Sequence, residues 1–258
     1  MDHPNFPAEL AARRMLPPDT VCVFAAGSLI QGWGNSMSDY DLYVVAREAW
    51  CPDGSVAHPV ALTPDRFFSE TLYVGNRVWE VRYWQAAQID QLLEMTVWDG
   101  TLAGLPPADL LGHQESVLLQ RLSHARAFSG APWLAERVER NARSALRPMF
   151  VVKMLDFADG SVDDALGQLE AGDLHSAVLS ARRGFHCAVD ALLASHGEFG
   201  ATPKWRARRF RAADPATLSF DRYWEVETMR SLDPGDPRSW VMDTVHLTKD
   251  IVLAVAVR

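Results

Sequence analysis

The chain has 258 residues, of which 48% are hydrophobic, so it can form one large domain or two modest ones with a real core. Its net charge of −8 argues against the broad basic surface that non-specific nucleic-acid binding needs. The three cysteines form no CxxC pair, which disfavours a disulfide framework and a thiolate zinc site. No segment approaches the roughly 20 apolar residues of a membrane span, and no secretory signal is evident, so we expect a cytoplasmic protein.

The first hundred residues predict strands with short helices between them. A helix is expected at Pro7–Leu16, and the apolar runs Val21–Phe24 and Leu42–Val45 predict strands on either side of a glycine-rich polar loop. We expect a loop over Arg47–Pro59, where proline and Asp-Gly punctuate the chain. A short helix is predicted from Thr63 to Gly75, with a threonine cap followed by proline.

The segment Asn76–Trp84 alternates in the way that a half-buried strand does. Three bulky side chains are predicted to share its buried face: Trp79, Val81 and Tyr83. The opposite face then carries Glu80 and Arg82 toward a functional site or solvent.

Beyond residue 85 the apolar residues recur at helical spacing. A helix over Asp173–His196 has Asp173 as its expected N-cap and Gly197 after its end. Further helices are predicted at 110–122, 132–157 (with Pro148 as a kink or break), 204–213, 221–231 and 238–255. The predicted fold class is therefore α+β, with a mixed sheet and flanking helices in residues 1–100 and an all-helical domain in residues 101–258.

The stretch Gly27–Asp41 carries the strongest chemical signal. Asp39 and Asp41 are two residues apart at a strand end, so both carboxylates point to the same side, where they repel unless a cation joins them. Magnesium accepts such hard oxygen ligands. Gly27 and Ser28 are predicted to form a strand-to-helix turn whose backbone N–H groups and hydroxyl can bind phosphate. The alternative is a turn with solvated or capping carboxylates.

The pattern of Gly27-Ser28, ten residues, then Asp39-Tyr40-Asp41 resembles the signature of the DNA-polymerase-β-like nucleotidyltransferase superfamily. The chain looks especially like adenylyltransferases of the streptomycin/spectinomycin type, which join this catalytic domain to a C-terminal helical domain. The resemblance implies a third carboxylate from a later strand, and Glu80 has the matching chemistry and position.

The resemblance implies transfer of a nucleoside monophosphate, with AMP from ATP favoured, onto a hydroxyl of a small molecule such as an aminoglycoside-like or other natural product, in antibiotic resistance or biosynthesis. Magnesium ions, with two favoured, would be held by Asp39, Asp41 and Glu80. Glu80 is either a metal ligand or the general base. The residues 101–258 would bind the acceptor.

Weaker signals concern phosphate binding. Lys204, in the basic segment Thr202–Arg211, either lies on a solvated helix face or contacts the triphosphate, a role for which Lys153 competes. Ser38 either binds phosphate or simply keeps its loop soluble.

Two other functions stay open. One is the same chemistry on a protein or RNA, as in toxin–antitoxin adenylyltransferases, although the negative charge disfavours RNA. The other is a non-catalytic nucleotide-binding regulator with the same fold. The sequence carries no indication of an oligomeric state.

Overall fold

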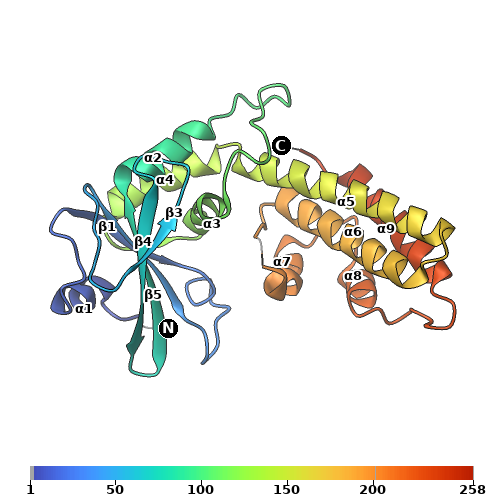
Figure 1. Cartoon of the computed structure of the whole chain (residues 1–258), viewed down its shortest axis with the longest axis horizontal. Coiled ribbons are helices and arrows are strands. Elements are labelled where there is room, and N and C mark those ends of the chain that lie inside the picture. Colours follow the sequence, from blue (N-terminus) through green and yellow to red (C-terminus); the bar gives the residue numbers. More distant parts are fainter. Residues whose placement is uncertain (1–2, 201, 258) are drawn as a thin grey trace. The chain divides into compact units, whose positions relative to one another are not determined.

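The structure is a computed structural model of the chain, and it describes residues 3–200 and 202–257 (Figure 1). The chain divides into two compact units. The first, here called the sheet unit, comprises Met1–Trp98 and Asp109–Leu146, and the second, the helical unit, comprises Asp99–Ala108 and Arg147–Arg258. All strands of the described residues belong to the sheet unit. The fold class is α+β, as predicted.

The sheet unit is built on one mixed six-stranded sheet with the strand order β3-β4-β5-β2-β1-β6. The strands are β1 (Thr20–Ala26), β2 (Tyr40–Ala46), β3 (Val56–Pro59), β4 (Arg66–Val74), β5 (Arg77–Gln85) and β6 (Arg126–Ser129). Strands β2 and β5 are parallel, and the other neighbours are antiparallel. The helices of this unit are α1 (Phe6–Ala12), α2 (Ala86–Met95), α3 (His113–Leu122) and α4 (Ala131–Ala142).

One face of this sheet forms an apolar core with α1. The predicted buried face of β5 is confirmed, because all three bulky side chains belong to this core: Trp79, Val81 and Tyr83. Phe6 of α1 packs edge-on against the Tyr40 and Trp79 rings, with centroids 4.9 Å away in each case. This burial fixes the register of the central strands, since a shift of one residue would turn these rings to the other face.

The helix predicted over Thr63–Gly75 is wrong, because most of this segment is the strand β4. The C-terminal end of this segment favours a strand. Gly75, at φ 61°, and Asn76 form a tight turn that joins β4 to β5 as a hairpin. Phe67 is buried in the sheet, where it stacks on Trp84 at 4.2 Å between ring centroids. Pairing with two neighbouring strands outweighs the local helix-start signal.

Two further expectations for the sheet unit differ from the structure. The predicted loop over Arg47–Pro59 contains the short edge strand β3, and β6 lies in a region expected to be helical. Residues 28–32 form consecutive turns rather than the helix expected after Gly27. Within these turns Gln31 N donates to Gly27 O at 3.1 Å and Gly32 N donates to Leu29 O at 3.3 Å, and Ser28 O accepts from Trp33 N and Gly34 N just beyond them.

The helical unit contains α5 (Leu146–Glu170), α6 (Leu174–Ser195), a 3-10 turn (Pro203–Trp205), α7 (Arg206–Ala213), α8 (Phe220–Glu227) and α9 (Arg238–Ala254). Helices α6 and α9 pack against each other, and one apolar cluster joins α5, α6, α7, α8 and α9 (Figure 1). None of the helices among the described residues is long and apolar enough to span a membrane.

The ends of α6 agree with the sequence prediction. Asp173 Oδ1 accepts from Ser176 N at 3.1 Å, and Gly197 follows the helix with φ 88°. The helix predicted over 132–157 is in fact two helices, since α4 ends at Ala142 and α5 begins at Leu146. Pro148 lies in the first turn of α5, where its missing N–H costs no helical hydrogen bond.

Candidate active site

The candidate site lies where β1 ends and β2 begins. Asp41 pairs with Ala26 of β1 on one side and with Glu80 of β5 on the other, so the two carboxylates lie on the same face of adjacent strands. The side chain of Asp41 is 10% exposed, whereas that of Glu80 is 38% exposed. Asp39 directly precedes β2 and is half-buried. The sheet register therefore brings together two of the three predicted acids.

Gly27 is required beside Asp41 for two reasons. Its φ of 83° is in the left-handed region that favours glycine. A Cβ at this position would also overlap Asp41 Oδ2 and crowd Arg121 Nη1 at 2.8 Å. The turn after β1 can therefore approach the carboxylate only because position 27 has no side chain.

Two arginines bind the carboxylates. Arg82 Nη1 donates to Asp41 Oδ1 at 3.1 Å, and its Nη2 donates to Glu80 Oε2 at 2.6 Å. Arg121, in the last turn of α3, forms an ion pair from Nη2 to Asp41 Oδ2 at 3.1 Å. Both oxygens of Asp41 are thus ion-paired. The sequence analysis placed Glu80 and Arg82 on the same face of the strand, whereas nothing in the sequence pointed to Arg121.

The arginine environment also includes Tyr43, which lies two residues after Asp41 on β2. The Arg82 guanidinium lies 5.6 Å from the centre of the Tyr43 ring. Burial raises the pKa of Tyr43 to about 12, so its hydroxyl stays neutral. Tyr43 thus stabilises the Arg82 guanidinium through its ring, and its hydroxyl takes no part in proton transfer near neutral pH.

The carboxylates as they stand do not fit a metal ion. Their oxygen donors have the right chemistry for magnesium. However, guanidinium groups already bind both Asp41 oxygens, and the described residues contain no group of three or more His, Cys, Asp or Glu side chains placed to hold a metal. The magnesium site at Asp39, Asp41 and Glu80 stays a prediction.

A cavity of about 210 Å³ lies beside Glu80 within the sheet unit. Its lining comes from β3, β4, β5 and the start of α3, and includes His58, Ser69, Thr71 and Gln114 together with Glu80 and Arg82. His58 Nε2 and Ser69 Oγ are 2.7 Å apart. The cavity therefore offers hydroxyl, amide and imidazole groups next to the more exposed carboxylate of the site.

Ser38 lies in a loop that is tied to β5. Its hydroxyl oxygen accepts from Asn35 N at 3.0 Å, and Arg77 Nη1 donates to Asn35 O at 2.7 Å and to Ser38 O at 2.9 Å. These bonds hold the chain in place just before Asp39. Ser28 is half-buried at the start of the turn after β1. Phosphate binding by Ser28 and Ser38 stays a prediction.

Lys204 belongs to the helical unit, in the 3-10 turn before α7. It is exposed, and its Nζ lies 5.6 Å from the centre of the Trp205 ring. Arg208 lies against the same ring at 5.4 Å. Lys153, the competing lysine, is half-buried on α5. The role of Lys204 toward a triphosphate stays a prediction.

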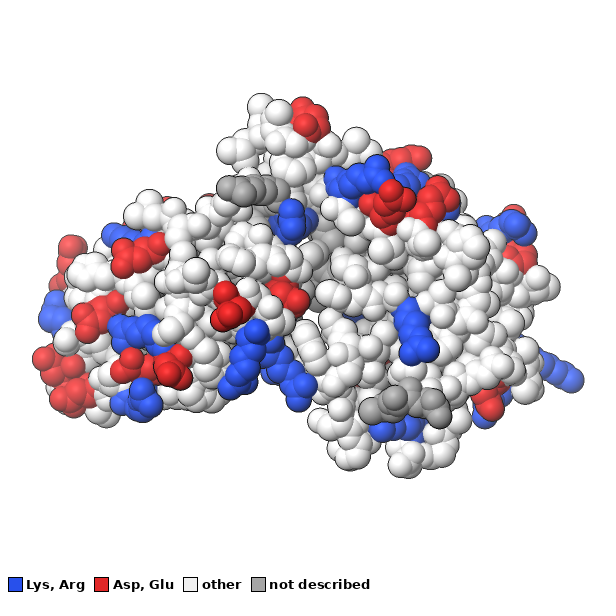
Figure 2. Space-filling view, turned by 180° about the vertical axis from the view of Figure 1, so that it is seen from behind, with Lys and Arg blue, Asp and Glu red and all other residues white. Residues whose placement is uncertain are grey.

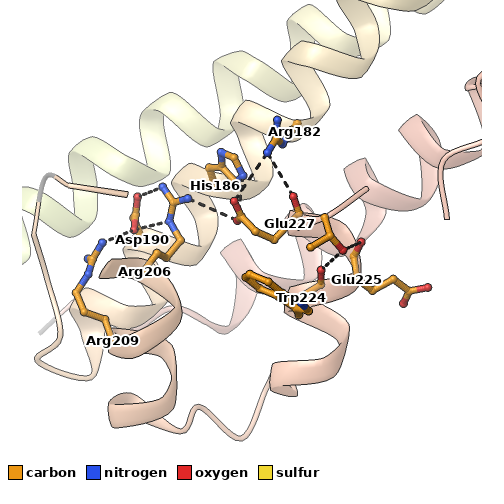
Figure 3. A network of polar contacts seen from close by, with 9 residues as sticks. Arg182, His186, Asp190, Arg206, Arg209, Trp224, Glu225 and Glu227 are labelled. Carbon is orange, nitrogen blue, oxygen red and sulfur yellow. Dashed lines mark hydrogen bonds and ion pairs between the residues drawn. The ribbon is translucent and has the colours of Figure 1, made fainter. Parts of the chain in front are cut away.

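Two arginines of this basic segment, Arg206 and Arg209, are buried in an ionic network that our sequence analysis did not predict (Figure 3). Arg206 donates to both oxygens of Asp190, at 3.0 and 2.8 Å, and Arg209 donates to Asp190 Oδ1 at 3.3 Å. Arg206 also forms an ion pair with Glu227 Oε2 at 3.6 Å. The network joins α6, α7 and α8 through Asp190 and Glu227.

Glu227 is the branch point of this network. Its Oε2 lies 3.1 Å from His186 Nε2, and its backbone carbonyl accepts from Arg182 Nη2 at 3.3 Å (Figure 3). Burial alone would raise the pKa of Glu227, but His186, Arg206 and Arg182 outweigh it and hold that pKa below its ordinary value. Glu227 is therefore ionised at neutral pH.

Charges on the face shown in Figure 2 are interspersed. Acidic and basic side chains occur there in separate small groups, and most of the face is uncharged. Such a surface differs from the basic stripe that tracks a nucleic-acid backbone.

Comparison with known proteins supports the fold. The chain is similar to the crystal structure of a nucleotidyltransferase-like protein from Exiguobacterium sibiricum 255-15, with a TM-score of 0.50, 10% identity and coverage of 96% of this chain and 72% of that one. At this identity the likeness shows the fold alone. No protein-family model and no curated protein matches the sequence. The chain thus has a nucleotidyltransferase-like fold.

Proposed function

We propose that this protein transfers a nucleoside monophosphate from a nucleoside triphosphate, with ATP favoured, to a hydroxyl of a small molecule. The observation that carries the proposal is the placement of Asp41 opposite Glu80 on the two central strands of a nucleotidyltransferase-like sheet, with Gly27 against Asp41. The resemblance of the Gly27–Asp41 motif to known nucleotidyltransferases points to the same reaction. An aminoglycoside-like acceptor remains the finer proposal.

In the proposed reaction, the acceptor hydroxyl oxygen attacks the α-phosphorus in line. The bond from the α-phosphorus to its bridging oxygen breaks, and pyrophosphate leaves. Glu80 accepts the hydroxyl proton, for which its exposed side chain beside the cavity is suited. The cavity would orient the hydroxyl toward Glu80 through its polar lining.

The phosphates would be bound by the turn after β1 and by the arginines. Gly27 lets backbone come close to a phosphate, and the Ser28 hydroxyl can donate to it. Arg82 and Arg121 carry N–H groups beyond those that bind Asp41 and Glu80, and guanidinium groups recognise phosphate oxygens well. Lys204 and Ser38 remain additional proposed contacts, and divalent magnesium remains the proposed cofactor.

A second function is favoured by one specific observation. Because both Asp41 oxygens are ion-paired with arginines, the site also suits a protein that binds a nucleotide without transferring it. Binding without turnover is the outcome that distinguishes this regulator from the enzyme.

The test is a transfer assay with labelled nucleotides, magnesium and a panel of hydroxylated acceptors, followed by mass spectrometry of the products. We expect an acceptor that carries a nucleoside monophosphate. Glu80→Gln should lower turnover by about 10²–10⁴-fold while calorimetry still shows triphosphate binding. Triphosphate binding without any adduct would support the regulator, and loss of binding in Glu80→Gln would make Glu80 a ligand rather than the base.

A further inference from the structure

The cavity beside Glu80 has a lining that indicates what kind of molecule it binds. All of its lining residues belong to the sheet unit. We propose that this cavity binds a neutral ring with several hydroxyl groups, as in a sugar or a cyclitol, and discriminates against the same ring when it carries an ammonium group. The inference rests on the proposed function only for the claim that the bound ring is the acceptor.

The charged side chains of the cavity cancel each other. Glu80 and Arg82 both line it, and Glu80 Oε2 lies 2.6 Å from Arg82 Nη2 in an ion pair. Glu70 also belongs to the lining, but it pairs with the core residue Val81, so its side chain points to the opposite face of the sheet. The carboxylate and guanidinium in the cavity therefore give it no net charge that would attract a charged ligand.

Two polar side chains of the lining are available to a ligand. The Thr71 hydroxyl and the Gln114 amide make no hydrogen bond within the part of the chain that the structure describes. Thr71 lies directly opposite Glu80 in the antiparallel pair of β4 and β5, so hydroxyl and carboxylate are neighbours on one face. Both groups donate and accept, as a ligand hydroxyl does. A ring with adjacent hydroxyls can therefore bind Thr71 and Gln114 while it presents one hydroxyl to Glu80.

The remaining polar groups of the lining are held in place by their own contacts. His58 Nε2 and Ser69 Oγ are 2.7 Å apart, and the His58 ring stacks on the buried Phe67 ring at 4.8 Å between centroids. Such groups lose little conformational freedom when a ligand binds. The cavity measures about 210 Å³, below the range of roughly 300–1,000 Å³ for drug-sized ligands, so we expect it to hold a single ring.

An ammonium group suits this lining poorly. It has three donors and no acceptor, so the donors of Thr71 and Gln114 would find no partner on it. It would also lie beside Arg82, whose like charge offsets the attraction of Glu80. The water that the ammonium loses would then be poorly replaced. An aminoglycoside-like acceptor would therefore enter the cavity with a ring that has no amine.

The experiment measures ring binding to the full chain by saturation-transfer difference nuclear magnetic resonance, without nucleotide. The probes are myo-inositol, D-glucose and D-glucosamine, of which the last differs from D-glucose only by an amine in place of one hydroxyl. We expect saturation transfer to at least one neutral ring, and a dissociation constant for D-glucosamine about tenfold higher than that ring's, the effect of one lost hydrogen bond.

Two variants test the assigned side chains. Thr71→Val removes the hydroxyl and keeps the branched shape, and Gln114→Leu removes the amide. Each should raise the dissociation constant of the neutral ring about tenfold. The matched control is Thr63→Val, because Thr63 is an exposed threonine of the sheet unit outside the cavity lining, and it hydrogen-bonds to Gln91 through its backbone. We expect no change in affinity for this control.

Three outcomes overturn the inference: no saturation transfer to either neutral ring, D-glucosamine binding as tightly as the neutral rings, or unchanged affinity in both Thr71→Val and Gln114→Leu. Circular dichroism confirms that each variant is folded, and if one is not, the other decides. The measurement needs no turnover. A neutral ring that binds but never receives a nucleotide would refute the transfer activity and leave this inference intact, whereas transfer to an acceptor without any ring binding in the cavity would do the reverse.

Discussion

Each unit of this protein holds two carboxylates bridged by one arginine, with a second arginine on one of them, yet the two arrangements differ in burial. In the sheet unit, the Arg82 and Arg121 side chains are 21% and 34% exposed. In the helical unit, those of Arg206 and Arg209 are 7% and 4% exposed. The same chemistry is thus accessible in one unit and enclosed in the other.

This difference in burial separates an exchangeable site from a structural one. A guanidinium that leaves Asp41 can be rehydrated or bind an incoming anion, so the exchange costs little. A guanidinium that leaves Asp190 would abandon a carboxylate between packed helices, where an unpaired charge is expensive. We therefore assign a ligand-binding role to the arginines of the sheet unit and a stabilising role to those of the helical unit.

The largest expected effect tests the stabilising role. Arg206→Ala leaves Asp190 and Glu227 without their shared partner in a buried setting, which should lower the free energy of unfolding by about 3–5 kcal/mol. Urea denaturation monitored by helical circular dichroism measures it. The control is Arg208→Ala on the exposed face of α7, for which we expect less than about 0.5 kcal/mol. Equal losses of unfolding free energy in the two variants would show that the buried arginine stabilises the helical unit no more than the exposed one.

The second prediction concerns Asp41, whose arginine partners are partly exposed. Asp41→Asn replaces one charged partner of both arginines with a neutral amide, and we expect a smaller loss of about 1–3 kcal/mol, because water screens and rehydrates the freed guanidinium groups. Thermal and urea unfolding measure the loss. Asp39→Asn is the matched change just before β2 and should have the smaller effect. A loss for Asp41→Asn as large as that for Arg206→Ala would mean that the sheet site is also structural.

Much of the sheet site could be predicted from the sequence because it depends on local patterns. The apolar runs around Gly27–Asp41 gave two strands, and the alternation in Asn76–Trp84 gave a third whose exposed face carries Glu80. The prediction of an α+β fold depended only on strands being grouped in one part of the chain and helices in another, and it is confirmed.

Long-range contacts explain what the sequence did not reveal. Arg121 reaches Asp41 from a helix far along the chain, so no spacing rule connects them. Strand β4 exists because two neighbours pair with it, although the residues just before it, Thr63 and Pro64, carry a helix-start signal. The burial of Arg206 and Arg209 had a weak local signal, since they share a face of α7 with the apolar Phe210, opposite to Arg208.

Substitution of Lys204 should have the smallest effect on stability. The same variant tests whether the helical unit also has a cation that binds the ligand. Lys204 is exposed and touches only the Trp205 ring among the interactions described, so Lys204→Ala should change the free energy of unfolding by less than about 0.5 kcal/mol. If Lys204 contacts the triphosphate, the same variant should raise the Michaelis constant for the triphosphate about tenfold, the cost of one charge-assisted hydrogen bond. Lys249→Ala, an exposed lysine on α9, is the matched control and should change neither quantity. An unchanged Michaelis constant in Lys204→Ala would assign Lys204 to the solvated surface, and would leave phosphate recognition to the arginines of the sheet unit.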